Sequence, residues 1–425
     1  MTNYKKILNI ALPAMAENFL QMLMGVVDSY LVASLGLVAI SGVSVAGNII
    51  SIYQAIFIAL GVAVSSLISK SLGEGDRDNL AYHTSEAIKL TMLVSMFLGF
   101  LSLVFGRRIL AWLGTEPAVA NAGGLYLALI GGMILLLGLM TTLGSLIRAT
   151  SNPRMPMYVS FLSNLLNVLF SSLAIFIFHM GIVGVALGTI LARLVGVLIL
   201  WKELSLPLVP WSWRLDWDLL RLSLPAAGER LMMRAGDVVI IAIIVKFGTD
   251  TVAGNAIGEV LTQFNYMPNF GVATATVMLV AHAVGQADFQ TVRKLTKQTY
   301  WLSLGLMLPV ALLIFALDQP LTHLYTKDSS AVTASLSVIL FSLLGVPMTA
   351  GTVIYTAVWQ GLGNAKLPFY ATTVGMWLIR IVAGYFLGVT LGLGLSGVWS
   401  ATLLDNGFRW IFLQIIYQRK MRKIT

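Results

Sequence analysis

Near the start of the chain, a stripe of polar side chains follows an otherwise apolar segment. Its members, Glu17, Gln21, Met24 and Asp28, are spaced i, i+4, i+7 and i+11. This spacing places them on one face of a helix over about 16 Å, at roughly 1.5 Å per residue. In a membrane-crossing helix, an ionisable side chain at mid-bilayer costs at least about 2.5 kcal/mol on insertion scales. We therefore expect the stripe to face an aqueous cavity or another part of the protein, not lipid.

Asp28 is the candidate for ion chemistry because it lies deepest in this segment. A carboxylate withdrawn from water favours its neutral form, so Asp28 could take up and release a proton near physiological pH. The same carboxylate could instead ligate Na+, or be a structural group satisfied by neighbouring hydroxyls and amides. Glu17 is closer to the end of the segment, where water can reach it.

Neutral polar groups on two later apolar segments are candidate partners for Asp28. Asn164, Asn167 and Ser171 share one helical face, and Thr189 stands in a run of small residues. Amide and hydroxyl oxygens beside a carboxylate suit a hard monovalent cation, which makes Asp28, Asn167 and Thr189 a possible Na+ site. The same side chains also join transmembrane helices by hydrogen bonds, so both interpretations stay open.

Composition predicts the elements that position these residues. With 58% hydrophobic and only 11% charged residues, a chain of 425 residues has too little polar surface for a soluble globule. Apolar runs of about 20 residues or more recur along it, each long enough to cross a bilayer as a helix. We predict an all-α integral membrane protein with twelve transmembrane helices, at 7–34, 43–70, 83–105, 120–147, 155–179, 181–202, 220–246, 252–284, 295–317, 331–358, 369–390 and 393–417.

The chain repeats itself after 212 residues. Leu12-Pro13-Ala14-x-x-Glu17 returns as Leu224-Pro225-Ala226-x-x-Glu229, and Gly73-x-x-Asp76 returns as Gly285-x-x-Asp288. A membrane protein built from two similar halves usually binds its substrate between them. The halves have diverged, however, because Ile240 stands at the position equivalent to Asp28.

The repeat divides the chain into two pseudo-symmetric six-helix bundles. We expect an amino-terminal lobe at 1–203, an interfacial linker at 204–218 and a carboxyl-terminal lobe at 219–425. The linker mixes prolines, charges and tryptophans, including Trp211 and Trp213. Such amphipathic rings favour the headgroup layer of a membrane.

The net charge of +9 is explained by topology, because the basic residues are scattered over loops that flank the predicted spans. If both termini are cytoplasmic, the outer loops hold few basic residues, namely Arg107, Arg108, Lys246 and Lys327. We therefore predict a multi-pass protein of the cell membrane with both termini in the cytoplasm. No nucleic-acid partner is implied.

The sequence speaks against an enzyme. It has no cysteine, its four histidines are dispersed, and it lacks the HExxH and Gly-x-Ser-x-Gly motifs. We expect no cofactor beyond a coupling ion.

Two charged pairs in the second half have ion-pair spacing. Arg234 and Asp237 are placed at i and i+3, and Asp405 and Arg409 at i and i+4. Arg380 lies within a predicted span and has no obvious partner in the sequence.

Several motifs, in this order, resemble the MATE family (multidrug and toxic compound extrusion) over essentially the whole chain. They are Pro13-x-x-x-Glu17, Val27-Asp28-Ser29-Tyr30-Leu31-Val32, Ser69-x-x-Leu72-Gly73-x-Gly75-Asp76 and Gln360-Gly361-x-Gly363-Asn364-x-x-x-Pro368. The resemblance implies cation-coupled drug efflux by alternating access of two six-helix lobes.

The resemblance also implies roles for individual residues. Asp28 is similar to the family's first-helix aspartate, and Asn167 and Thr189 to members of its amino-lobe cation site, whereas Ser171 stands where an asparagine or aspartate is usual. We expect ion coupling to involve Asp28, Asn164, Asn167, Ser171 and Thr189. Met233 and Thr349 stand where some sodium-coupled members have acids, so coupling to H+ or to Na+ stays open.

The expected substrates are amphiphilic, mostly cationic drugs or dyes, carried by a monomer in the lipid bilayer. We expect them to contact Glu17, Gln21, Met24, Glu229, Met233, Glu259 and Gln263. The alternative is a flippase of the same superfamily that moves lipid-linked oligosaccharides. Such a flippase would need a strongly cationic cavity for pyrophosphate.

Overall fold

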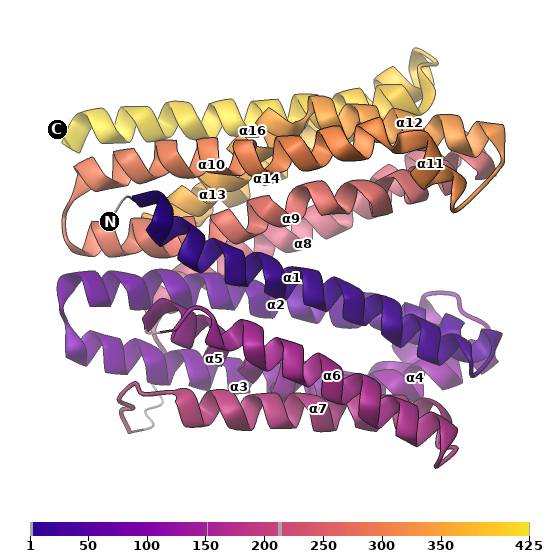
Figure 1. Cartoon of the computed structure of the whole chain (residues 1–425), viewed down its shortest axis with the longest axis horizontal. Coiled ribbons are helices and arrows are strands. Elements are labelled where there is room, and N and C mark those ends of the chain that lie inside the picture. The colour runs from indigo at the N-terminus through magenta and orange to yellow at the C-terminus, as the bar shows by residue number, and fades with distance from the viewer. Residues whose placement is uncertain (1–2, 151, 211–214, 425) are drawn as a thin grey trace. The chain divides into compact units, whose positions relative to one another are not determined.

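The computed structural model describes residues 3–150, 152–210 and 215–424, and within them the regular structure is helical (Figure 1). Trp211 and Trp213 of the predicted linker lie outside the described residues. The chain forms two compact units, Ala16–Ser223 (the first unit) and Leu224–Thr425 together with Met1–Met15 (the second unit). The lobe boundaries at 203 and 219 stay a prediction.

The helices of the first part of the chain are α1 (Asn3–Ala33), α2 (Leu37–Glu74), α3 (Arg77–Trp112), α4 (Pro117–Gly132), α5 (Ile134–Thr150), α6 (Met155–Phe176) and α7 (Gly181–Glu203). Those of the second part are α8 (Trp217–Val245), α9 (Thr249–Gly285), α10 (Phe289–Ala316), α11 (Asp318–His323), α12 (Ser329–Leu344), α13 (Val346–Gly361), α14 (Lys366–Thr373), η1 (Val374–Ile381), α15 (Val382–Tyr385), η2 (Phe386–Thr390) and α16 (Gly394–Ile424).

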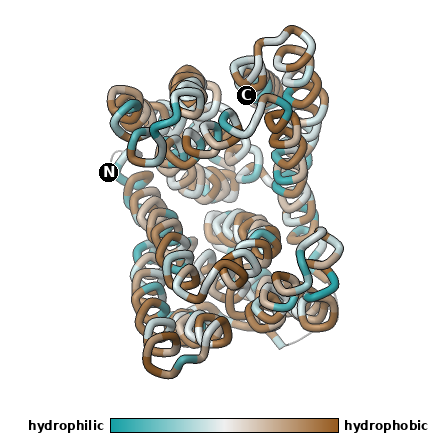
Figure 2. Tube along the Cα trace, turned by 90° about the vertical axis from the view of Figure 1, so that its right-hand side faces the viewer, coloured by the Kyte–Doolittle hydropathy of each residue, from teal (hydrophilic) through white to brown (hydrophobic). Residues whose placement is uncertain are grey.

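Eight of the described helices are long and apolar enough to cross a membrane, or ten spans result if two bent pairs each count as one. The helices α8 and α16 are long enough but more polar, because they carry groups such as Arg234, Asp237, Asp405 and Arg409. The protein is therefore an all-helical, multi-span membrane protein. Its helical turns are largely hydrophobic, and hydrophilic residues gather in the loops (Figure 2).

Two predicted spans are not single helices, which corrects the sequence prediction. The span predicted at 120–147 bends by 44° between α4 and α5, and the one at 331–358 bends by 57° between α12 and α13. The breaks lie at Met133 and Gly345, which are equivalent positions of the repeat. Apolar composition continues across both breaks, so hydropathy alone did not reveal them.

The turns and helix caps repeat as the sequence does. Gly36 and Gly248 precede α2 and α9 with φ angles of 105° and 100°, a backbone region that glycine enters without steric cost. Asp76 and Asp288 cap α3 and α10 by accepting backbone N–H groups of the first turn. The repeated Gly-x-x-Asp motif therefore ends one helix and begins the next.

Helix packing shows the same repeat within each unit. In the first unit α2 packs against α4 and α5, and in the second unit α9 packs against α12 and α13. Each unit has its own apolar core, with Phe57 and Leu127 fully buried in the first and Val272, Val358 and Leu413 in the second.

The described part of the predicted linker is tied to α3 within the first unit. The Asp216 carboxylate lies 2.6 Å from Nδ1 of His83, and the Val209 amide donates to the Ser85 hydroxyl at 2.8 Å. Asp216 also caps α8 by accepting the amides of Asp218 and Leu219. One carboxylate thus fixes both the linker and the start of α8.

The penultimate span is wound unusually. Its segments η1 and η2 are π-helical, a rare form that is frequently found at functional sites. Gly375 in η1 lies against the side chains of Asp405 and Arg409 of α16, so a larger residue there would collide with them. The sequence analysis did not anticipate this winding.

Candidate functional site

The first site is centred on Asp28 of α1. The side-chain amide of Asn167, on α6, donates toward both carboxylate oxygens of Asp28, at 3.3 and 3.5 Å. Asn167 is 5% exposed, while Asp28 is half-buried. The structure therefore brings together the deepest acid of α1 and the amide that the polar-face pattern had paired with it.

Two hydroxyls orient Asn167. Its side-chain oxygen lies 2.9 Å from Oγ of Ser171 and 3.3 Å from Oγ1 of Thr189. The Val185 carbonyl is a second acceptor for both hydroxyls, at 3.5 and 3.0 Å respectively. Since each hydroxyl has one proton, the shorter distances assign the Ser171 proton to Asn167 and the Thr189 proton to Val185. Ser171 thus reaches Asp28 through Asn167, whereas Thr189 only lies beside the same Asn167 oxygen.

This orientation matters for the ion that the site can accept. The nitrogen of Asn167 faces Asp28, and its oxygen faces the two hydroxyls. A sodium ion on Asp28 requires oxygen ligands, which Asn167 would supply only with its amide turned over and its nitrogen donating to the Ser171 hydroxyl. A proton requires no ligand beyond the carboxylate itself.

Asn164 and Gln21 position α1 at other points. The Asn164 amide donates to the Leu20 carbonyl at 3.2 Å, so it contacts the α1 backbone and not Asp28. Gln21 accepts from the Gln54 amide at 3.4 Å. Met24, which lies between Gln21 and Asp28 in the chain, is partly exposed.

Glu17 has a partner that the sequence did not indicate. Its carboxylate lies 2.5 Å from Arg148 of α5 and accepts from the Ser160 hydroxyl at 3.4 Å. The Glu17 and Arg148 side chains are only 18% and 12% exposed. Glu17 is therefore neutralised within the first unit, which leaves Asp28 as the less firmly paired acid of the stripe.

Two further residues interact electrostatically with Asp28, namely Tyr126 of α4 and Arg193 of α7. Arg193 follows Thr189 by one helical turn, which is the signal that could have linked it to this face. Tyr126 is buried and has no polar neighbour in the sequence pattern that would single it out.

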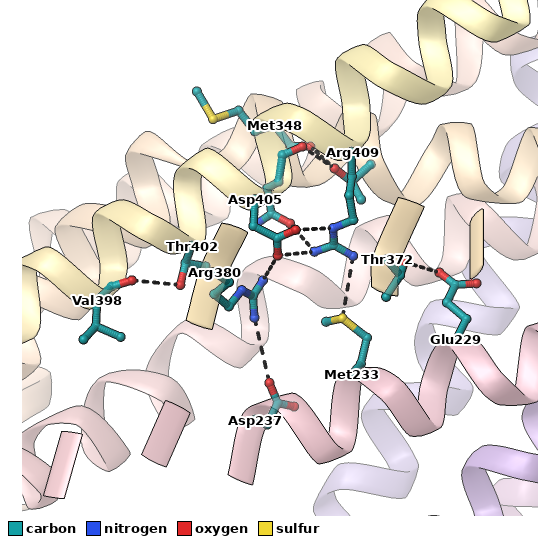
Figure 3. Close-up of polar contacts among 12 residues, drawn as sticks. Glu229, Met233, Asp237, Met348, Thr372, Arg380, Val398, Thr402, Asp405 and Arg409 are labelled. Carbon is teal, nitrogen blue, oxygen red and sulfur yellow. Dashed lines mark hydrogen bonds and ion pairs between the residues drawn. The ribbon is translucent and has the colours of Figure 1, made fainter. Parts of the chain in front are cut away.

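The second site is a charged cluster in the second unit (Figure 3). Asp405 is fully buried, and Nε and Nη2 of Arg409 donate to its carboxylate oxygens at 2.8 and 2.9 Å. Nη2 of Arg380 lies 2.9 Å from an oxygen of the same carboxylate. This confirms the predicted pair of Asp405 with Arg409 and supplies the missing partner of Arg380.

Asp237 is the loose member of the cluster. Its nearest ion-pair partner among the described residues is Arg380, at 3.8 Å, and its side chain is 45% exposed. The predicted pair with Arg234 is wrong, because a base from a neighbouring helix lies closer than the one on α8 itself.

The predicted substrate contacts of α8 are engaged by neighbouring side chains. Glu229 accepts from the Thr372 hydroxyl at 3.2 Å and from the Gln360 amide at 3.5 Å. The Met233 sulfur lies 3.7 Å from Nη1 of Arg409. Figure 3 draws this contact as a dashed line. Met233 therefore belongs to the same cluster.

On α9, Glu259 and Gln263 are exposed. Glu259 accepts from the Asn255 amide at 3.1 Å, and the indole N–H of Trp399 in turn donates to Asn255 at 3.0 Å. This chain of bonds fixes one oxygen of Glu259 and leaves the other available.

A comparison with protein families finds one match that covers most of the chain. The family model described as MatE matches residues 13–173 and 225–386. The two matched segments begin at Pro13 and Pro225, which are equivalent positions of the repeat.

Known proteins of similar sequence and fold agree with this match. A "Probable multidrug resistance protein NorM" of Thermotoga maritima is 27% identical over 418 residues, covering 95% of this chain and 90% of that protein. A crystal structure of MATE in the bent conformation superposes with a TM-score of 0.92 at 18% identity, covering 99% of this chain and 96% of that one. The structure of a MOP superfamily transporter from Pyrococcus furiosus superposes with a TM-score of 0.88 at 19% identity, covering 99% of this chain and 96% of that one. For that protein, the reverse polarity of its binding pocket suggests a different function.

Proposed function

The chain belongs to the MatE family, and on this premise we propose that it exports amphiphilic, mostly cationic small molecules in exchange for protons. It is a membrane transporter and not an enzyme. In the proposed cycle twelve spans form two lobes, at 1–203 and 219–425, which open alternately to the two sides of the cell membrane. Both termini are cytoplasmic, and the transporter acts as a monomer.

The observation that carries the proposal is the contact between Asp28 and Asn167. A half-buried carboxylate inside a span is costly unless it has a role, and its principal hydrogen-bond partner is a neutral amide, not a fixed base. Such a carboxylate can change its charge without breaking a salt bridge. Protonation of Asp28 and binding of a cationic substrate then favour opposite states of the lobes, which is sufficient for exchange by linkage.

Protons are favoured over Na+ because the Asp28 carboxylate alone can take up a proton, whereas Na+ requires several oxygen ligands and the Asn167 atom that faces Asp28 is its nitrogen. Each charge moved along a potential of about 100 mV supplies roughly 2.3 kcal/mol, close to a 50-fold gradient. A single coupled proton is therefore enough for substantial export.

The test is export from liposomes that contain the full chain. Export of rhodamine 6G, a fluorescent organic cation, is recorded under an imposed proton gradient, with Na+ absent and then present. We compare the parent with Asp28→Asn and with Asp250→Asn, a control acid exposed at the start of α9. Export driven by protons alone in the parent and control, and lost in Asp28→Asn, is the expected result. A strict need for Na+ would assign the coupling to a metal at Asp28, Asn167 and Thr189.

A flippase for lipid-linked oligosaccharides is the second candidate, favoured by the arginines that the second unit holds within its helices, namely Arg230, Arg234, Arg380 and Arg409. Two of these guanidinium groups, however, share the buried carboxylate of Asp405. Tight binding of an undecaprenyl-linked sugar to the purified protein, undisturbed by cationic dyes, would establish the flippase and exclude the efflux proposal.

A further inference from the structure

We propose that Asp237 of α8 is a second binding group for organic cations, and that Arg380 is the internal counter-charge that such a cation displaces. This inference deepens the proposed efflux function, on which it rests, because it assigns a cation subsite to the second unit. From its spacing in the sequence, Asp237 was expected only to form an ion pair with Arg234.

One part of the charged cluster is fixed. Asp405 has no exposed surface, and two guanidinium groups hold it through three contacts of 2.8 to 2.9 Å. One carboxylate offsets the charge of only one of these two guanidinium groups. Asp237 is the second acid that the structure places beside Arg380.

The contact of Arg380 with Asp237 is open to exchange. Its 3.8 Å separation exceeds hydrogen-bonding distance, and Asp237 has no hydrogen-bond donor among the described residues. Figure 3 shows the Arg380 guanidinium between Asp405 on one side and Asp237 on the other. An approaching cation can reach the carboxylate of Asp237, because that side chain is nearly half exposed, whereas the buried carboxylate of Asp405 is inaccessible to it.

Arg380 also carries an unused donor. The residue is 9% exposed, and its Nε atom is buried without an acceptor in the part of the chain that the structure describes. A bound molecule that brings a carbonyl, ether or ester oxygen would satisfy this N–H. The subsite is therefore suited to an organic monocation that also carries a hydrogen-bond acceptor.

The surrounding charges support displacement over simple addition. Glu259 of α9 interacts electrostatically with both Asp237 and Arg380, and Arg234 lies one helical turn before Asp237. The charges of Asp405 and Arg409 cancel. The positive charges of Arg234 and Arg380 then balance the negative charges of Asp237 and Glu259. A bound monocation therefore takes the place of Arg380 beside Asp237, while Arg380 keeps its contact with Asp405 and can donate from Nε to an acceptor of the bound molecule.

The winding of η1 sets the direction of Arg380. This residue lies in the last turn of a π-helical segment, and such turns are frequently found at functional sites. The close approach of Asp405 and Arg409 to Gly375 anchors the start of the same segment.

The proposal is tested by binding of rhodamine 6G, a monocation with an ester oxygen, to the purified full chain in detergent. Fluorescence anisotropy gives the Kd of the parent, of Asp237→Asn, of Arg380→Gln and of the control Asp250→Asn. Asp237→Asn should bind about tenfold more weakly, since a charged hydrogen bond is lost. Arg380→Gln should bind more tightly than the parent, because the competitor for Asp237 is gone. The control should match the parent.

These opposite effects separate a binding role from a structural one, which would weaken binding in both variants. Unchanged binding in Asp237→Asn, or weaker binding in a folded Arg380→Gln, overturns the subsite. If Arg380→Gln does not fold, Asp237→Glu replaces it. The longer carboxylate reaches Arg380 more closely and should weaken dye binding, whereas unchanged binding again overturns the subsite. A parent that binds no dye counts against the efflux function itself.

Discussion

Asp405 and Asp237 both face Arg380, but these two carboxylates differ in burial and in how closely basic groups contact them. Asp405 is fully buried under two guanidinium groups, whereas Asp237 is 45% exposed at 3.8 Å. Asp405→Asn should therefore cost about 3–5 kcal/mol of stability, because it leaves buried bases without a carboxylate. Asp237→Asn should cost less than about 1 kcal/mol. Thermal unfolding of both variants in detergent measures the difference, and equal losses would contradict it.

At the residue scale, local spacing predicted more than long-range pairing. The i,i+4 spacing of Asp405 and Arg409 fixes their geometry within one helix, so the sequence alone identified this pair. Glu17 and Arg148 are 131 residues apart, and only helix packing brings them together. No periodicity in one segment could have shown that contact.

The contact of Asn167 with Asp28 lies between these cases. A polar face on one helix and a lone acid on another made the contact a reasonable expectation. The order of contacts was not predictable, because the distances that place Ser171 and Thr189 behind Asn167 depend on how α6 and α7 pack.

At the element scale, helices were predictable from apolar run length, but their interruptions were not. The breaks at Met133 and Gly345 occur inside uniformly apolar stretches, and η1 is apolar except for Arg380. Hydropathy reports whether a segment suits the bilayer and not how it is wound. The repeat was the better guide, because the breaks recur at equivalent positions.

The start of α8 allows a prediction of pH dependence. Burial of Asp216 raises the pKa of its carboxyl, but hydrogen bonds from His83 and from the amides of Leu219 and Asp218 outweigh this effect and hold the pKa below its usual range. A depressed carboxyl pKa stabilises the fold above the unfolded value of about 3.9, and this stabilisation is lost as the pH falls through the folded value.

We therefore expect Asp216→Ala to lower the stability of the α8 start by about 1 kcal/mol at neutral pH, the usual value of a helix cap. Hydrogen exchange of the Asp218 and Leu219 amides measures this effect directly. Both amides should exchange faster in the variant, and the difference from the parent should shrink as the pH falls below about 3.9 and vanish only below the lowered pKa of Asp216. A difference that persists in acid would show that the carboxylate charge is not what holds this turn.

At the scale of the whole molecule, the distribution of basic residues predicts which loops are cytoplasmic. The chain has no cysteine, so single cysteines can report the side of each loop without background. Lys327→Cys, in a predicted outer loop, should react with a membrane-impermeant maleimide in intact cells. Lys366→Cys, in a predicted inner loop, should react only after permeabilisation. Both positions are exposed, so access to the reagent is not limited by burial. The reverse pattern would invert the predicted topology and the direction of transport.

In the proposed cycle, Asp28 exchanges a proton for a substrate. To test this exchange, rhodamine 6G is added to the purified protein in a weakly buffered, slightly acidic solution, and proton release is recorded with a pH indicator. The parent and the control Asp250→Asn should release up to about one proton for each dye bound. Asp28→Asn should bind dye and release none. Equal release from Asp28→Asn, or none from a parent that binds dye, would contradict proton coupling through Asp28.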